Sequence, residues 1–346
     1  MKEILKKLCA MRAVSGFEYR ASDDIAELFK PYADEVYRDN IGNLIAVKRC
    51  GRENAKKLMI EAHMDEIGLA VRDIDDDGFI SFVRVGGIDP RILPAAEVIV
   101  HAKRDLKGVI GAKPPHLQEA GEASKATKIK DMTIDVCLAA DEVRDLVSVG
   151  DSITLCGDTT ELMGGILSGK TMDDRACIAI LIKTMQALSR VKTEVDVYAV
   201  CAVCEEVGGR GAVTAGFEIM PDIAVALDVT HAITPDNSRD AFELGSGVAI
   251  SVGPNIHPAL YKRLSDTANA LGIKHTTEVE GGDTGTDAWL LQVCATGIPT
   301  ALLSVPLRYM HTSVETLDMA DMQCAKELLA RFAAELSGDM EEWLCI

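Results

Sequence analysis

The most informative segment for the fold is Val195-Asp196-Val197-Tyr198-Ala199-Val200-Cys201-Ala202-Val203-Cys204-Glu205-Glu206. Its first ten residues are apolar except Asp196 and contain several valines, which is typical of a central strand buried on both faces. Two acids follow, where this strand should end. In open α/β sheets, ligand sites lie outside the carboxyl ends of the strands. We therefore expect Glu205 and Glu206 either at a functional site or in a solvated turn.

Similar apolar strands alternate with helical segments on both sides of this stretch. Such alternation predicts an α/β sheet that is covered by helices on both faces. The helical segments have one apolar face or are apolar throughout. The expected elements, in chain order, are strand Lys57–Ala62, helix Asp173–Leu188, strands Ile223–Leu227 and Gly247–Val252, helix Pro258–Leu271, strand Thr300–Val305 and helix Leu317–Leu336.

Residues 72–165 have a different pattern. Short apolar runs are separated by turn signals such as Asp75-Asp76-Asp77-Gly78, and only Ala140–Val147 has a helical pattern. This predicts a β-rich insertion, a small barrel, within an α/β domain of residues 1–71 and 166–346. We expect a mobile loop at Leu117–Lys130. The strands expected in the insertion are Phe79–Val85, Glu97–Ala102, Gly108–Gly111, Thr133–Leu138 and Ser152–Leu155.

Composition excludes several classes of function. The chain has 346 residues and a formal net charge of −18, so it lacks the basic face that nucleic acids or anionic membranes require. No stretch reaches the roughly 18 apolar residues of a membrane span, and residues 1–7 have no signal-peptide pattern. The ten cysteines, such as Cys137 and Cys294, mostly lie in apolar runs. They predict small buried side chains in a reducing, cytoplasmic compartment.

In two segments, acids or a histidine lie where a predicted strand ends or a predicted helix begins. His63 and Asp65 follow the strand Lys57–Ala62. A metal-bound imidazole donates its other N–H to a carboxylate, so Asp65 could orient His63 on a metal, or both could lie in a polar surface turn. Asp173 follows a glycine turn at the start of a helix. It is either an acid favoured there by the helix dipole or a metal bridge.

Asp228 and His311 repeat this pattern after the strands Ile223–Leu227 and Thr300–Val305. Each is either an ordinary turn residue or a metal ligand, and His231 is a rival ligand that we expect in a loop. Parallel strands end at one edge of a sheet, so all five segments should meet there. Two histidines and three carboxylates suit two cations such as Zn²⁺ or Co²⁺, bridged by one carboxylate at about 3.5 Å. One further acid is left for proton transfer.

Short motifs that span nearly the whole chain point to a known family. Together they resemble the cytosolic tetrahedral (TET) aminopeptidases, which include bacterial glutamyl and deblocking aminopeptidases. The motifs, in order, are Ser15-Gly16-Phe17-Glu18, Ala62-His63-Met64-Asp65-Glu66-Ile67-Gly68, Lys113-Pro114-Pro115-His116-Leu117, Val147-Ser148-Val149-Gly150-Asp151, Asp173-Asp174-Arg175, Glu205-Glu206-Val207-Gly208, Leu227-Asp228, Gly285-Thr286-Asp287-Ala288, and His311 with Glu315.

The resemblance implies two divalent metal ions per subunit, zinc or cobalt. The metal ligands of the family fall on His63, Asp173, Glu206, Asp228 and His311. It further implies that Asp173 bridges the two ions. His63 and Asp228 would hold one ion, and Glu206 and His311 the other.

The resemblance also implies an activity and an architecture. Glu205 would be the general base and Asp65 the supporting acid of a metal-dependent aminopeptidase that acts on peptides with a free amino end. The implied fold is a three-layer phosphorylase/hydrolase-like α/β domain with an inserted β-barrel used for dimerisation. Dimers in this family often assemble into a hollow dodecamer, so we expect a homo-oligomer, with neither nucleic acid nor membrane as a partner.

Two other classes of function stay open. In the first class the metals are kept but a different bond of the substrate is cleaved, as in a carboxypeptidase, a deacylase or an endoglucanase-like glycan hydrolase. Glycosidases, however, typically use a carboxylate pair without metal. The other is an inactive assembly shell, against which the complete ligand set counts. Two departures from the family pattern, Gly209 and Thr312-Ser313-Val314, replace no ligand and bear only on substrate preference.

Overall fold

Strand β12 (Asp196–Ala202) lies inside the large sheet of the molecule, and all its residues are buried. The structure is a computed structural model that describes residues 1–118, 125–239 and 241–344. In spatial order its sheet consists of β1 (Glu35–Arg38), β2 (Leu44–Lys48), β12, β3 (Lys57–His63), β13 (Ile223–His231), β16 (Thr300–Arg308), β17 (Glu315–Asp318), β11 (Ile166–Gly169) and β10 (Thr160–Glu161), while β14 (Val248–Val252) pairs with β16 and with β15 (His275–Val279).

The centre of this sheet is parallel and its flanks are antiparallel. Strands β12, β3, β13 and β16 run in the same direction, so their carboxyl ends lie along one edge. Strand β2 pairs with β12 in the opposite direction, as do β14 and β17 with β16. The predicted α/β sheet is therefore confirmed, as a mixed sheet with a parallel centre.

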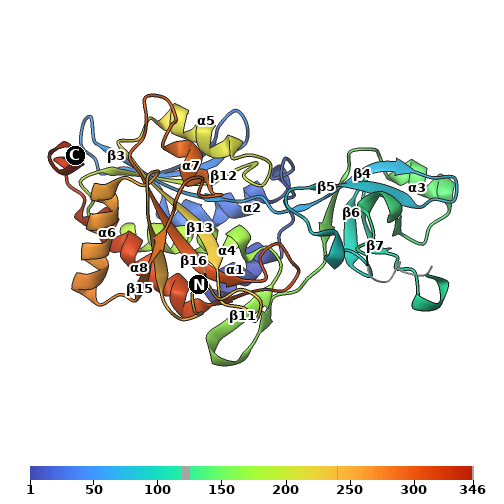
Figure 1. Cartoon of the computed structure of the whole chain (residues 1–346). Helices are drawn as coiled ribbons and strands as arrows, with labels where there is room; N and C mark the ends of the chain where they lie inside the picture. Colours follow the sequence, from blue (N-terminus) through green and yellow to red (C-terminus); the bar gives the residue numbers. More distant parts are fainter. Residues whose placement is uncertain (119–124, 240, 345–346) are drawn as a thin grey trace.

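Helices cover both faces of the sheet, because successive side chains of a strand point to opposite sides. In β3, Leu58 and Ile60 pack into one core, whereas Met59 packs into the other. The two helical layers are visible on opposite sides of the sheet in Figure 1. The first layer contains α1 (Lys2–Cys9), α2 (Tyr19–Phe29), α4 (Met172–Leu188), α6 (Pro258–Leu271) and α8 (Met319–Glu335), and the second contains α5 (Arg210–Ile219) and α7 (Asp287–Leu291).

The predicted β-barrel is present and projects to one side of the α/β part (Figure 1). It closes because its first strand pairs with its last as well as with its neighbour. Its interior is a separate apolar cluster that includes Phe82 and Ile134. Helix α3 (Ala140–Leu146) lies beside it. Around the barrel the strands are β4 (Gly68–Ile74), β5 (Ile80–Val85), β8 (Ile134–Asp135), β7 (Asp105–Ile110), β6 (Glu97–His101) and β9 (Ser152–Leu155).

One strand of the barrel is shorter than predicted. Within Thr133–Leu138 only Ile134–Asp135 is a strand, because the Asp135 carboxylate accepts the N–H of Cys137 and turns the chain. Cys137 is exposed, so the expectation that it is buried was wrong, whereas Cys294 is buried as expected. The predicted mobile loop includes residues 119–124, which lie outside the described residues.

The boundaries of β13, β16 and α8 also differ from prediction, since β16 continues past Val305 to Arg308. Strand β13 does not end at Leu227 but continues to His231, because Val229 to His231 keep pairing with β16. Helix α8 begins at Met319 rather than Leu317, because the Asp318 carboxylate accepts the N–H of Ala320 and caps the helix. Sequence periodicity did not reveal the length of β13, since it depends on the neighbouring strand β16.

Candidate active site

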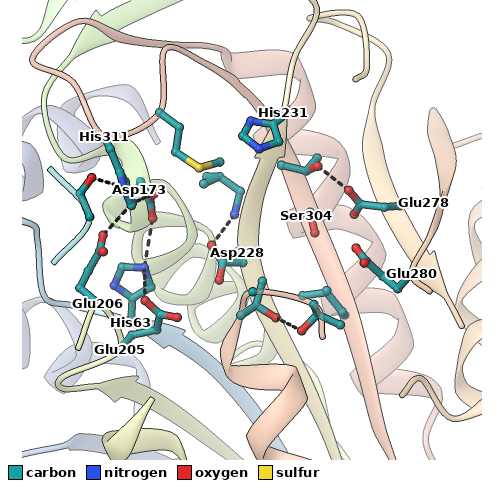
Figure 2. A pocket seen from close by; sticks show the side chains of 18 residues that line it. His63, Asp173, Glu205, Glu206, Asp228, His231, Glu278, Glu280, Ser304 and His311 are labelled. Carbon is teal, nitrogen blue, oxygen red and sulfur yellow. Dashed lines mark hydrogen bonds and ion pairs between the residues drawn. The ribbon is translucent and has the colours of Figure 1, made fainter. Parts of the chain in front are cut away.

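The five predicted ligand side chains converge at the carboxyl edge of the parallel strands. They come from the end of β3, the start of α4, the turn after β12, the middle of β13 and the loop after β16, and Figure 2 shows them around one cavity. The cavity has a volume of about 530 Å³. The five residues are His63, Asp173, Glu206, Asp228 and His311.

Asp173 lies between the two histidines. Its Oδ1 atom is 3.1 Å from Nε2 of His63, and its Oδ2 atom is 3.2 Å from Nε2 of His311. Burial opposes ionisation of Asp173, but hydrogen bonds to the two imidazoles outweigh it and hold its pKa below the ordinary value. Asp173 and the following residue lie in the first turn of α4 with non-helical backbone angles, and Asp173 does not act as its N-cap.

The acids after β12 lie on either side of this group. Glu206 Oε1 is 3.1 Å from Nε2 of His311, and Glu205 Oε2 is 3.9 Å from Nε2 of His63. Burial raises the pKa of Glu205 to about 9. Burial lowers the pKa of His311, but hydrogen bonds to Asp173 and Glu206 outweigh this and raise it to about 11. The turn thus lines the cavity, with both acid side chains mostly buried.

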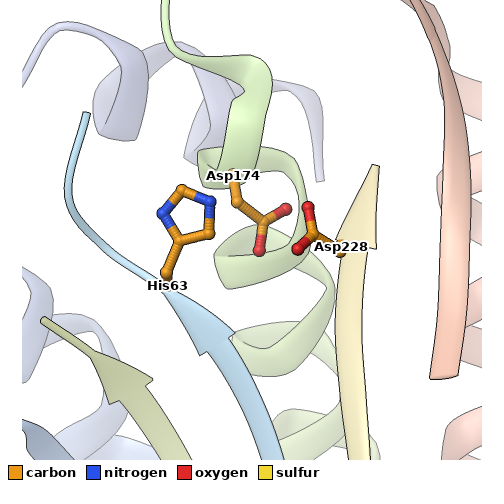
Figure 3. A group of neighbouring side chains, drawn as sticks. All are labelled: His63, Asp174 and Asp228. Carbon is orange, nitrogen blue, oxygen red and sulfur yellow. The ribbon is translucent and has the colours of Figure 1, made fainter. Parts of the chain in front are cut away.

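Asp228 belongs to a second group that contains a residue the sequence analysis did not single out. Figure 3 shows His63, Asp174 and Asp228 as neighbouring side chains. Each of them offers a ligand atom within 4.8 Å of the others. Asp174 is completely buried, and neither of its oxygens has a hydrogen-bond partner among the described residues. The motif Asp173-Asp174-Arg175 contained it, but the sequence did not reveal that it lies beside Asp228. Burial raises the pKa of both Asp174 and Asp228 well above the ordinary value.

Two buried carboxylates hold the ligand-bearing segments by their backbones. Asp65 accepts the N–H groups of Glu205 and Glu206, each at 3.1 Å. Its Oδ1 atom also lies 3.5 Å from Nδ1 of His63, on the side away from the cavity. Glu315 accepts the N–H of Asp173 at 3.1 Å and that of His311 at 2.8 Å. The motif set contained Glu315, but only the structure reveals what it contacts.

The second nitrogen of His311 contacts the polypeptide of the predicted insertion. Its Nδ1 atom lies 3.0 Å from the carbonyl oxygen of Gly87. A carbonyl can only accept, so Nδ1 donates its proton to Gly87, while Nε2 is the nitrogen that faces the carboxylates. A Cβ atom on Gly87 would lie 2.8 Å from Nδ1 of His311, so this approach requires glycine.

The lining of the cavity is rich in acids and contains no lysine or arginine among the described residues. His231 also lines it, from the end of β13, so the expectation that it lies in a loop was wrong. Imidazole nitrogen and carboxylate oxygen are ligands that zinc and similar cations accept. Three overlapping groups of these side chains could hold metal ions: His63 with Asp174 and Asp228, His63 with Glu205 and Glu206, and Asp173 with Glu206 and His311.

Comparison with known proteins identifies the family. A family model described as M42 glutamyl aminopeptidase matches residues 42–328. This chain belongs to the M42 family. Membership in this family confirms the resemblance predicted from the sequence, and it assigns this M42 peptidase to the aminopeptidases. A lysyl aminopeptidase of Pyrococcus furiosus is 36% identical over 341 residues, which cover 96% of this chain and 97% of that relative.

Solved structures agree with this assignment. An aminopeptidase of Desulfurococcus kamchatkensis superposes on this chain with a TM-score of 0.90 and is 34% identical in sequence. The superposition covers 99% of this chain and 96% of the aminopeptidase chain. A TET1 peptidase of Pyrococcus horikoshii has a TM-score of 0.83 and is 31% identical in sequence, covering 97% of this chain and 99% of the TET1 chain. That peptidase is described as able to assemble into a tetrahedron or a large octahedral shell. These likenesses confirm the predicted fold class.

Two further sequence predictions can be compared with the M42 peptidase structure. Among its described residues, no helix combines the length and the apolar character that crossing a lipid bilayer requires. All the cysteines that the structure describes are unpaired. The cytoplasmic location itself stays a prediction.

Proposed function

We propose that this M42 peptidase holds two divalent metal ions per subunit, zinc or cobalt, and removes amino-terminal residues from short peptides. The observation that carries the proposal is the position of Asp173, whose two oxygens face the two different histidines at 3.1 and 3.2 Å. A carboxylate in this position can bridge two ions. His63 and Asp228 would hold one ion, and Glu206 and His311 the other.

Glu205 is the general base in this proposal. Bound divalent ions lower the pKa of water towards neutrality and polarise the scissile carbonyl group. The Glu205 carboxylate lines the cavity 3.9 Å from Nε2 of His63, within reach of a water in the cavity. The positive charge of bound ions would favour the ionised form of Glu205 over the protonated form that burial alone favours. From there it would accept the proton of the attacking water and deliver a proton to the departing amine. Asp65 supports this role, because it holds the backbone N–H groups of Glu205 and Glu206 in place.

The charge of the cavity favours cleavage at the amino end. Its lining is acidic and, among the described residues, lacks lysine and arginine. Such a site attracts the free α-ammonium group of a peptide and repels a terminal α-carboxylate. We therefore prefer an aminopeptidase to a carboxypeptidase.

We further propose that the subunits form dimers through the inserted barrel domain, which was predicted as residues 72–165 and whose first strand, β4, begins at Gly68, and that the dimers assemble into a dodecamer. The likeness to the TET1 peptidase, with its described assembly into a tetrahedron, supports this. Light scattering coupled to size-exclusion chromatography should give a mass near twelve times 37.2 kDa. A monomeric mass at micromolar concentration would contradict the proposal.

The activity is tested on purified protein with several substrate classes. Aminoacyl p-nitroanilides should be hydrolysed, whereas N-acetylated amino acids, peptides blocked at the amino end and carboxymethylcellulose should not. Dialysis against a chelator should abolish hydrolysis, and Zn²⁺ or Co²⁺ should restore it, because the proposed chemistry depends on the ions. Elemental analysis should find about two metal ions per chain. Hydrolysis of the blocked or glycan substrates alone would favour a deacylase or glycan hydrolase, and protein with neither metal nor activity would favour an inactive shell.

A further inference from the structure

The cavity extends beyond the proposed metal site towards the edge of the sheet. Figure 2 shows the proposed ligands on one side, Asp228 and Ser304 in the middle, and Glu278 and Glu280 on the other side. Glu278 lies in β15 and Glu280 directly follows this strand, so both side chains point to the same face of the sheet. Neither acid belongs to the metal-binding groups described above.

The two acids differ in how they are held. The carboxylate of Glu278 accepts hydrogen bonds from the hydroxyls of Thr230 and, at 3.1 Å, Ser251, which fix its position. The side chain of Glu280 makes no hydrogen bond within the described part of the chain. Burial raises the pKa of Glu280, and the neighbouring charges of Glu278 and Asp283 raise it further.

No cation of the described residues balances these charges. Glu278, Glu280 and Asp283 take part in no ion pair among residues 1–118, 125–239 and 241–344, and no lysine or arginine of these ranges lines the cavity. Adjacent carboxylates that lack a counter-ion repel one another. The arrangement is favourable once a positive group from outside the chain enters the cavity.

Ser304 gives a second, independent indication of a ligand. This residue of β16 is only 1% exposed and lines the cavity. Its hydroxyl has no hydrogen-bond partner among the described residues, although buried polar groups are almost always paired. It lies directly opposite Asp228 in the pairing of β16 with β13 and therefore faces the same side of the sheet. It is thus placed to bind a polar group that enters beside the proposed metal site.

The spacing fits a long basic side chain. Glu278 is bound to Thr230, which is two residues beyond Asp228 on the same face of β13. Two residues of a strand span about 7 Å. The four-carbon stem of lysine places its ammonium group about 6 Å from the Cα atom. A residue whose amino end lies at Asp228 can therefore bring its side-chain cation to the two glutamates.

We propose that Glu280 and Glu278 form the pocket for the first residue of the substrate, and that they select lysine or arginine at this position. This inference rests on the proposed aminopeptidase function and names its substrate class. Opposite charges in a partly buried pocket attract the basic side chain, and the same charges repel aspartate and glutamate. Glu280 is the main determinant, because its carboxylate is not engaged in other hydrogen bonds, whereas Glu278 is shared with two hydroxyls.

The test compares substrates of similar length and different charge. The full-length, metal-loaded protein is assayed with the p-nitroanilides of lysine, arginine, methionine and glutamate. We expect kcat/KM for lysine and arginine to exceed that for methionine at least about tenfold, and glutamate to be the poorest substrate. Glu280→Gln should lower the ratio of kcat/KM for lysine to that for methionine by about 10- to 100-fold, with a smaller decrease for Glu278→Gln.

Two variants sharpen this test. Glu280→Lys should reverse the preference, so that glutamate becomes a better substrate than lysine. Glu53→Gln is the matched control, because Glu53 is exposed and far from the cavity lining, and it should leave the ratio unchanged. A wild-type lysine-to-methionine ratio near one, or a ratio that Glu280→Gln does not change, overturns the inference while the aminopeptidase proposal stands.

Equilibrium binding decides the inference even without turnover. If no substrate is hydrolysed, the proposed function fails. Calorimetry with lysinamide and methioninamide then still measures how tightly the pocket binds each amide. Tighter binding of lysinamide that is lost in Glu280→Gln supports the pocket as a basic side-chain site. Equal binding of the two amides overturns it.

Discussion

The α/β part and the barrel bury different kinds of side chain. The barrel core is an apolar cluster around residues such as Phe82 and Ile134, and its buried polar exceptions are few, with His101 paired to Asp105 and Thr154. The α/β part also has large apolar cores, but it buries a group of carboxylates at one edge of its sheet. These carboxylates are Glu61, Asp65, Asp173, Asp174, Asp228, Asp287 and Glu315.

The difference separates a region built for stability from one built for chemistry. Burying a carboxylate costs free energy unless hydrogen bonds or opposite charges compensate it. The barrel buries few polar groups, so this cost is small there. At the sheet edge several carboxylates are buried, and burial raises the pKa of groups such as Glu205 and Asp228 far above the ordinary range. Perturbed groups that cluster in a cavity are typical of functional sites.

The strongest test of this contrast is the acid proposed to act in catalysis. Glu205→Gln should lower kcat about 10²- to 10⁴-fold, because the amide cannot accept the proton of water. The metal content should stay close to that of the wild type. Glu206→Gln is the matched variant one residue further on, and it should lower metal content as well as activity. Equal loss of metal in both variants would refute the division of roles.

A smaller effect is expected where a carboxylate acts only through the backbone. The two carboxylate oxygens of Glu315 accept the N–H groups of Asp173 and His311, and Glu315→Gln replaces one of these oxygens by an NH₂ group that cannot accept. The substitution should lower kcat/KM about 10- to 100-fold. Asp318→Asn is the control on the same strand, since Asp318 caps α8 outside the cavity. Asparagine caps a helix about as well as aspartate, so this substitution should change the stability by less than about 0.5 kcal/mol and leave kcat/KM unchanged. A loss of activity in both variants would point to general destabilisation of β17.

The contact between the two regions gives a third test. Gly87→Ala places a methyl group against His311 and should lower kcat/KM about tenfold, because a small displacement of a catalytic group is costly. Gly111→Ala is the control, since a Cβ atom there meets nothing within 4 Å. If Gly87→Ala is as active as Gly111→Ala, the Gly87 carbonyl does not position His311.

The smallest effect on activity is expected inside the barrel. Phe82→Ala should lower the free energy of unfolding by about 3–5 kcal/mol, because it leaves a cavity in a closed apolar core. The folded fraction should keep the wild-type kcat/KM. Phe79→Ala removes the same side chain at a position that is 39% exposed, and urea unfolding should detect a change of only about 0.5 kcal/mol. A loss of kcat/KM in Phe82→Ala would mean that the barrel core also supports catalysis.

Much of the fold could be predicted from the sequence because its signals are local. Apolar runs located β12 and β3, amphipathic periodicity located α6, and frequent turn signals located the barrel. Acids and histidines that directly follow such strands, as His63 and Glu206 do, predicted the residues that the structure brings together. Their assigned roles in metal binding and catalysis remain proposals.

Only the tertiary structure decided which segments face one another. Asp174 joins Asp228, Glu315 holds the backbone of His311, and Glu280 faces the cavity because β15 pairs with β14 rather than with another strand. The length of β13 likewise depended on its partner β16. Composition and periodicity describe each segment separately, whereas these contacts depend on strand order and register, which are properties of the whole chain.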